Sequence, residues 1–378
     1  LLASWLGSPE LIPYLRILAL GVPLFGLAKI HRATLISLNA VRRAALVEVS
    51  FRVGQLALVL LLVALGWSLT GAILASLGAS VLRLVVARIF VRPPLFRRPA
   101  FPLARLLRYA FPLFFFTIGM RFFYRADLMV VKALGESPAA AGYYGAAQNL
   151  TIVPFGMFGV SFSALLLATL PSLWQREELL HAQSLIGQAI RLVLCFLPLS
   201  AVLAGSASGV AALVLGGSFS PAAPLVAWLA FAALGFLMIS VTMTILTVAG
   251  RPGWTVALTA PVALLALGGC LLLVPRFGAI SAAATTTVLA WASAILTLFA
   301  VHRWCGVRPR VGTILRTGLM ALVAFTLSLF WQTAGAGVVV ELFILTGVVI
   351  GGLFVLGELK VQDWAFAQSL LVREGNGS

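Results

Sequence analysis

Residues 92–108 read RPPLFRRPAFPLARLLR and carry five arginines and four prolines between two long apolar segments. The other arginines follow the same rule, because nearly all of them lie in every second gap between apolar segments. A protein that crosses a bilayer many times has this pattern, since Lys and Arg stay on the cytoplasmic side. The alternation therefore predicts a polytopic membrane protein and indicates its orientation.

The composition points to the same class. Of 378 residues, 62% are hydrophobic and 10% are charged, whereas a soluble domain is nearer half apolar and a quarter charged. The net charge of +16 would suggest nucleic acid for a soluble protein, but here the basic residues are topology signals beside anionic lipid. We expect no nucleic-acid partner. Cys195, Cys270 and Cys305 are too far apart for a metal motif, and we expect no metal or cofactor.

About eleven apolar segments reach the length of about 20 residues that a membrane span needs. The predicted fold is an all-α polytopic bundle. We place its spans at 11–38, 45–66, 69–91, 108–133, 139–170, 184–215, 222–249, 253–274, 279–301, 312–332 and 338–357.

Charge orients these spans. One set of gaps holds about thirteen arginines, while only Lys132 and Arg276 are basic in or beside the other set, which places the first set in the cytoplasm. The C-terminal tail with Lys360 is then cytoplasmic and residue 1 lies outside. The chain opens on Leu1-Leu2-Ala3-Ser4-Trp5 without an initiator Met, and we expect an odd number of spans ahead of it.

The segment 108–133 contains Arg121, Arg125, Asp127 and Lys132. At 100° per residue the three cations fall within about 40° of one another, and Asp127 lies about 120–160° away. A charge deep in a membrane helix faces a cavity or a partner. The stripe therefore predicts either a site for an anionic group such as a diphosphate or an interhelical salt-bridge network, and Asp127 is expected to meet a different helix as a coupling or structural residue.

Other polar residues allow two interpretations each. Gln148 and Asn149 are adjacent amides in an apolar segment and could contact sugar or phosphate, or bond a neighbouring helix. Lys29 and Arg32 share a helix face and could receive a phosphate from the inner leaflet, or extend to the membrane interface. Glu48 and Arg52 form an i, i+4 pair that we expect to be structural, and no catalytic motif is present.

Two stretches resemble a known family. FFYRADLMVVKALG at 122–135, followed by AGYYGAAQ at 141–148, and LLVPRFGAISAA at 272–283 are similar to motifs of the polysaccharide biosynthesis (Wzx-type) oligosaccharide flippases, which belong to the multidrug/oligosaccharidyl-lipid/polysaccharide exporter superfamily. Leu173 follows a Thr-Leu-Pro element similar to one in that family. Ile280-Ser281 replaces a small residue and Gly of the family pattern.

This resemblance implies two six-helix lobes around a cavity, of the MATE/flippase type, with two further helices in longer members. On that map 1–91 is the remainder of the N-terminal lobe, with about three spans missing in front. Residues 92–107 form a cytoplasmic linker and 108–301 the C-terminal lobe. The extra pair of spans is 302–357 and the cytoplasmic tail is 358–378.

The resemblance implies a flippase, not an enzyme, in the bacterial inner membrane. It would move an isoprenoid-diphosphate-linked oligosaccharide, such as an O-antigen (lipopolysaccharide) or exopolysaccharide repeat unit, by alternating access. Membrane lipids, and a polymerase or ligase of the glycan pathway, are further expected partners. The alternatives are a multidrug exporter, against which the cationic stripe argues, a ligase or polymerase, against which the short outer gaps argue, and a passive scaffold.

Overall fold

The structure is a computed structural model that describes residues 12–38, 40–92, 107, 125–331, 333 and 335–359. The chain divides into two compact units, Leu1–Phe111 with Gln368–Ser378, and Pro112–Ala367. Nine helices in the described ranges are long and apolar enough to cross a membrane, which confirms the expected all-α polytopic fold. Most of the predicted linker 92–107, and the tail beyond residue 359, lie outside the described residues.

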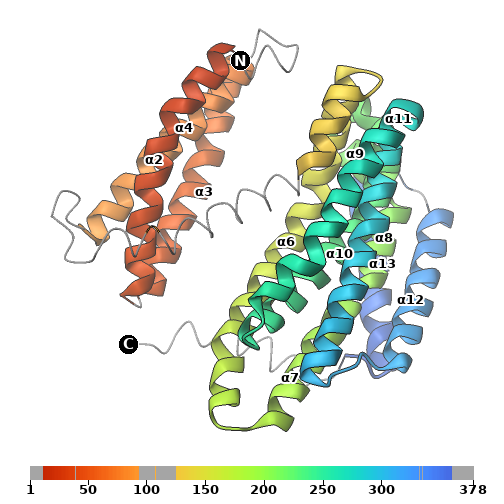
Figure 1. The fold of residues 1–378 in the computed structure, drawn as a ribbon. Helices are drawn as coiled ribbons and strands as arrows, with labels where there is room; N and C mark the ends of the chain where they lie inside the picture. The colour runs from red at the N-terminus through yellow and green to blue at the C-terminus, as the bar shows by residue number, and fades with distance from the viewer. Residues whose placement is uncertain are drawn as a thin grey trace. The chain divides into compact units, whose positions relative to one another are not determined.

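The first unit contains three membrane-length helices, α2 (Ile12–Ser37), α3 (Val41–Ala64) and α4 (Ser68–Phe90) (Figure 1). Helix α4 packs against both α2 and α3. A small core of Leu35, Ala44, Val47 and Ala87 joins the three. The helices match the spans predicted at 11–38, 45–66 and 69–91.

Glu48 on α3 links that helix to α4. The expected contact with Arg52 is present, with the Arg52 Nε 3.4 Å from the Glu48 Oε1. A shorter contact of 2.6 Å joins the Glu48 Oε2 to the Arg83 Nη2 on α4, and the Arg83 guanidinium also lies 4.9 Å from the centre of the Phe51 ring. Arg83 is buried, and a buried charge requires such partners. The ion pair between Glu48 and Arg83 therefore joins α3 to α4.

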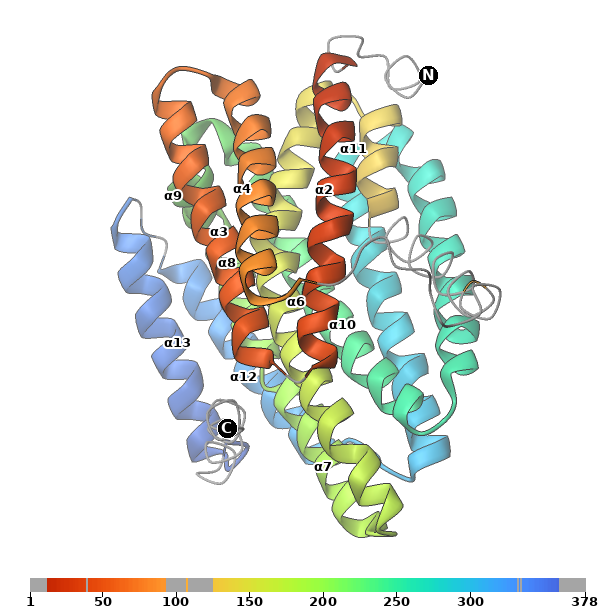
Figure 2. The same ribbon diagram turned by 90° about the vertical axis from the view of Figure 1, so that its left-hand side faces the viewer.

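The second unit is built around α10 (Ala223–Val248), which packs against α6, α8 and α11 and is the most deeply buried of the membrane-length helices in the described ranges. Figures 1 and 2 show these helices side by side, with α12 and α13 next to each other at one edge of the unit. The helical residues 125–134 precede these elements. The other elements are α6 (Pro138–Gln175), α7 (Leu179–Leu194), α8 (Leu197–Gly205), α9 (Ala207–Leu215), the 3-10 helix η2 (Gly217–Ala222), α11 (Pro252–Cys305), α12 (Val311–Phe330) and α13 (Gly337–Val355).

Helix α11 covers two predicted spans, 253–274 and 279–301, in one run of 54 residues. The two halves meet at Gly278, whose φ of 66° and ψ of −161° are not helical. This backbone region is essentially restricted to glycine. A Cβ at Gly278 would also lie 2.6 Å from the Glu136 Oε1. The helix is therefore interrupted at Gly278, which separates the two predicted spans.

Replacing Gly278 with alanine is expected to lower the free energy of unfolding by about 1–3 kcal/mol, because alanine must adopt a strained backbone conformation. Gly268 is the matched control, since it is in the same helix and a Cβ there would have nothing within 4 Å. Alanine at Gly268 should leave stability unchanged or raise it. Thermal unfolding of the detergent-solubilised variants measures both effects, and equal midpoints for the two variants would contradict this role of Gly278.

Candidate functional site

Asp127 is buried between three helices of the second unit. It lies on the helical residues 125–134, and its side chain is 8% exposed. From α6, the Tyr144 hydroxyl donates to its Oδ2 at 2.7 Å and the Gln148 Nε2 lies 3.0 Å from both carboxylate oxygens. From α11, the Thr286 hydroxyl donates to Oδ2 at 3.2 Å. The backbone N–H of Leu128 donates to Oδ1 at 2.7 Å. Asp127 therefore meets other helices, as the helical angles predict.

Gln148 connects Asp127 to Arg125. Its side chain is buried, its Nε2 donates to the Asp127 carboxylate, and its Oε1 accepts a hydrogen bond of 3.2 Å from the Arg125 Nη1. An amide has one donor side and one acceptor side, so a carboxylate on one side and a guanidinium on the other fix its orientation. Gln148 thus holds the Arg125 side chain in place.

Arg125 itself is exposed, in contrast to Asp127 and Gln148. Neither Arg125 nor Lys132 forms an ion pair with any acidic residue in the described part of the chain. The two cations are seven positions apart, so they lie within about 20° on one helix face. The cationic groups of Arg125 and Lys132 therefore lie outside the buried, hydrogen-bonded carboxylate of Asp127.

A small cavity of about 20 Å³ lies beside Asp127. Its walls come from residues 125–134, α10 and α11, and include Asp127, Phe236, Cys270 and Thr286. That volume is enough for about one water molecule. The buried side of Asp127 therefore cannot accommodate a phosphate or a sugar, and any large anionic group would have to meet Arg125 from its exposed side.

A sequence profile of the polysaccharide biosynthesis protein family matches residues 1–224, more than half of the chain. The chain belongs to this family. The resemblance that the motifs at 122–148 and 272–283 indicate is thereby confirmed at the level of the family. The sequence has no match among curated proteins.

The fold of this chain is similar to a solved structure described as the lipid II flippase MurJ in an inward closed conformation. The TM-score is 0.72, and the match covers 96% of this chain and 74% of that chain at 14% sequence identity. At this identity the likeness establishes the fold. It agrees with the polytopic flippase-type bundle that the sequence predicts.

The remaining predicted site residues differ in their exposure. Asn149 is exposed, next to the buried Gln148, and Lys132 is half-buried. Lys29 is exposed on α2 of the first unit. Arg121 and the side chain of Arg32 lie outside the described residues.

Sequence reasoning did not identify two partners of Asp127. Tyr144 is fully buried and belongs to the quoted motif at 141–148, but its hydroxyl had no assigned role. Thr286 is 159 positions from Asp127 in the chain. The only signal for it was the run Thr285-Thr286-Thr287 in an otherwise apolar helix, a polar cluster of the kind that bonds across membrane helices.

Proposed function

We propose that this protein is a flippase that moves an isoprenoid-diphosphate-linked oligosaccharide across the bacterial inner membrane by alternating access. The family and the flippase-type fold support the general activity. The observation that carries the substrate class is the exposed Arg125 side chain, held by the buried Gln148. The C-terminus is cytoplasmic in this proposal, as the positive-inside pattern indicates.

The chemistry follows from the charge of the substrate. A guanidinium presents several donors in a planar fork and binds phosphate oxygens in pairs. Arg125, Lys132 and Arg121 would hold the diphosphate or acidic sugars, and Asn149 would contact polar groups. Asp127 and Gln148 act as positioning residues, because their hydrogen bonds are already directed at Arg125 and at α6 and α11.

Residues outside the Arg125 site also have proposed roles. Lys29 and Arg32 would receive the phosphate at the inner leaflet. Residues 108–301 would form the second lobe and 302–357 an additional pair of spans. A polymerase or ligase that uses the exported glycan, an O-antigen or exopolysaccharide unit, would act after this protein.

The test is the sidedness of the lipid-linked oligosaccharide in membranes of cells with and without the protein. We expect the glycan to remain on the cytoplasmic leaflet when the protein is absent, where a membrane-impermeant reagent reaches it only in inverted vesicles. Normal sidedness with unpolymerised glycan outside would contradict flipping and would indicate a downstream enzyme or a scaffold.

A further inference from the structure

Two neighbouring spaces lie at one end of the second unit. The first is a cavity of about 310 Å³ between α7 and the segment that joins α11 to α12. The second is a groove of about 620 Å³ between the ends of α6, α7, α10 and α11. Gln183 lines both spaces, and its Nε2 donates to the Cys305 carbonyl at 3.0 Å. The cavity and the groove are therefore continuous at Gln183.

The order of residues along both walls gives the order of the two spaces. On α7, the residues that line the groove lie between 179 and 186, and those that line the cavity lie between 183 and 194. On the opposite wall, residues 304–306 line the groove, and residues 307–310 with Thr313 line the cavity. The cavity therefore lies between the groove and Thr313 at the start of α12.

The cavity is suited to a negatively charged group. Arg308 and Arg310 line it, and neither forms an ion pair with an acidic side chain in the part of the chain that the structure describes. The Arg308 Nε donates to the His302 Nε2 at 2.8 Å, which orients the guanidinium without neutralising it. Helix α12 begins beside the cavity at Val311, and the N-terminal end of a helix also favours a negative group. A carboxylate would satisfy both features.

The groove is suited to apolar side chains. Its walls include Trp174, Leu179, Ile186, Val248 and Trp304. The Leu179 side chain is 59% exposed, so the apolar wall is accessible from outside. An accessible apolar groove of this size is typical of a binding site for another segment of chain.

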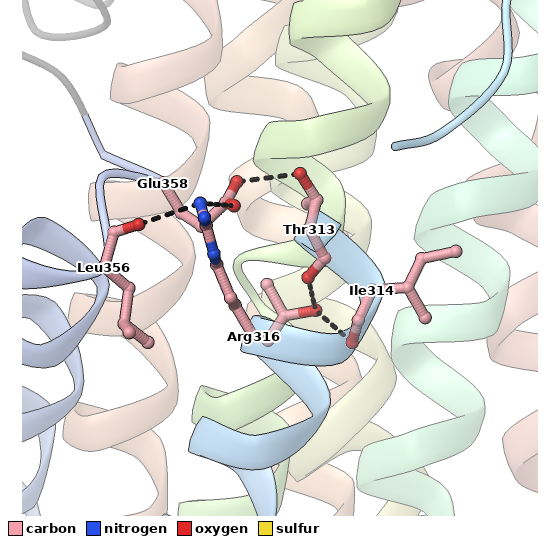
Figure 3. Close-up of polar contacts among 6 residues, drawn as sticks. Thr313, Ile314, Arg316, Leu356 and Glu358 are labelled. Atoms are coloured by element: carbon pink, nitrogen blue, oxygen red, sulfur yellow. Dashed lines mark hydrogen bonds and ion pairs between the residues drawn. The ribbon is translucent and has the colours of Figure 1, made fainter. Parts of the chain in front are cut away.

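The C-terminal tail starts beside the cavity. Glu358 is buried, and its Oε2 accepts a hydrogen bond of 2.9 Å from the hydroxyl of the lining residue Thr313 (Figure 3). Its Oε1 accepts from the Arg316 Nη1 at 3.1 Å, and that nitrogen also donates to the Leu356 carbonyl at 3.0 Å. Leu359 packs against a core formed by α8, α12 and α13. The residues after 359 therefore leave from a fixed point next to Thr313.

The sequence of the tail has the same order of chemistry as the two spaces. Residues 360–371 read KVQDWAFAQSLL. The acidic Asp363 comes first, and an apolar run that includes Trp364 and Phe366 follows it directly. Starting from Glu358, the surface likewise presents the cationic cavity first and the apolar groove beyond it.

The length of the tail permits this pairing. Asp363 is five positions after Glu358, and five residues of extended chain span up to about 17 Å. Arg310 is only three positions before Thr313, which contacts Glu358 directly. Asp363 can therefore reach Arg310, and the apolar residues after it can continue past Gln183 into the groove.

We propose that the cavity and the groove bind residues 360–371 of the same chain. The Asp363 carboxylate contacts the guanidinium groups of Arg308 and Arg310, and Trp364 and Phe366 lie in the groove. The tail is favoured over a separate protein because it is tethered beside the cavity, which gives it a high effective concentration there. This inference does not depend on Arg125 or on the proposed transport activity.

The experiment is a thiol cross-link in the full chain, in detergent and in lipid nanodiscs. Cys305 lines the groove, whereas Cys195 and Cys270 are buried. Ala365→Cys adds a thiol between Trp364 and Phe366 without removing either side chain. We expect a short bismaleimide to join this thiol to Cys305 within one chain, as measured by peptide mass spectrometry. The control Ser378→Cys adds a thiol 13 positions further along the tail and should give at least fivefold less of this product.

A charge exchange tests the contact at the cavity. In the Ala365→Cys protein, Asp363→Arg should lower the cross-link yield at least fivefold, because it places a third cation beside Arg308 and Arg310. Adding Arg308→Asp and Arg310→Asp to that variant should restore the yield to within twofold of the starting protein. Such a recovery excludes misfolding as the cause of the first loss.

A second pair of variants tests the groove. Leu179 lines the groove and is 59% exposed, and its neighbour Leu180 is 80% exposed and is not a lining residue. Leu179→Gln should lower the cross-link yield at least threefold, because it places a polar group on the apolar wall. Leu180→Gln makes the same chemical change one position away and should leave the yield unchanged.

Four results would overturn the proposal. The first is an equal yield for Ala365→Cys and Ser378→Cys, and the second is a failure of the exchanged charges to restore the product. The third is a cross-link that forms only between two chains, which would assign the groove to a second copy of the protein. The fourth is a cross-link that forms in detergent and is lost in nanodiscs, which would place the tail on the membrane surface.

Discussion

Replacing Arg125 with glutamine is expected to reduce glycan translocation at least tenfold while leaving the amount of protein in the membrane unchanged. The side chain is exposed and gives one hydrogen bond of 3.2 Å to the Gln148 Oε1, so the fold loses little when it is removed. A charge-assisted contact to phosphate contributes about 1.5–3 kcal/mol, which corresponds to about 10- to 150-fold in an equilibrium constant.

Two control variants accompany Arg125→Gln: one keeps the positive charge at residue 125, and the other removes a positive charge at a different position. Arg125→Lys keeps the charge but loses the planar fork, and it should retain intermediate transport. Arg276→Gln removes an exposed cation elsewhere in the second unit and should transport normally. Surface glycan measured against membrane protein level gives the result, and wild-type transport by a well-expressed Arg125→Gln variant would contradict the role of Arg125 in substrate binding.

Replacing Asp127 with alanine is expected to destabilise the second unit by about 3–5 kcal/mol. The substitution leaves the hydroxyl of Tyr144, the amide of Gln148 and the hydroxyl of Thr286 without their shared acceptor, and each unsatisfied buried group costs about 1–3 kcal/mol. The loss of orientation at Gln148 should also release Arg125. Unfolding in detergent measures the stability, and Glu136→Ala, at an exposed carboxylate, should change it by less than about 0.5 kcal/mol.

A double-mutant cycle with Tyr144→Phe tests whether the hydrogen bonds are the cause. Alone, Tyr144→Phe should cost about 1–2 kcal/mol, because Asp127 keeps its other donors. In the Asp127→Ala background the same change should be neutral or stabilising, since it removes an unsatisfied hydroxyl. Additive losses would show that Asp127 and Tyr144 act independently.

The spans were largely predictable because bilayer thickness fixes their length. The expected span 222–249 corresponds to α10 (Ala223–Val248), and 312–332 corresponds to α12 (Val311–Phe330). Breaks within spans were harder to predict. The expected span 184–215 is divided into α7, α8 and α9, because Pro198 and small residues allow the helix axis to change without an interruption in hydropathy.

The candidate site was predictable only in part. Helical angles along 121–132 separate Asp127 from the cations, because this separation depends on local geometry alone. The same angles cannot identify the partners of Asp127, since Thr286 is 159 positions away and its approach depends on how α11 packs. The sequence likewise indicated Glu48 with Arg52, whereas the closer partner, Arg83, is 35 positions away on α4.

The most direct test of the central claim is translocation by the purified protein in proteoliposomes that contain a lipid-linked oligosaccharide on one leaflet. A membrane-impermeant glycan-modifying enzyme reports how much substrate reaches the other leaflet over time. We expect translocation that requires the protein and that Arg125→Gln slows at least tenfold. Equal rates in empty and protein-containing vesicles, under each ion gradient tested, would contradict the assignment of this protein as a flippase.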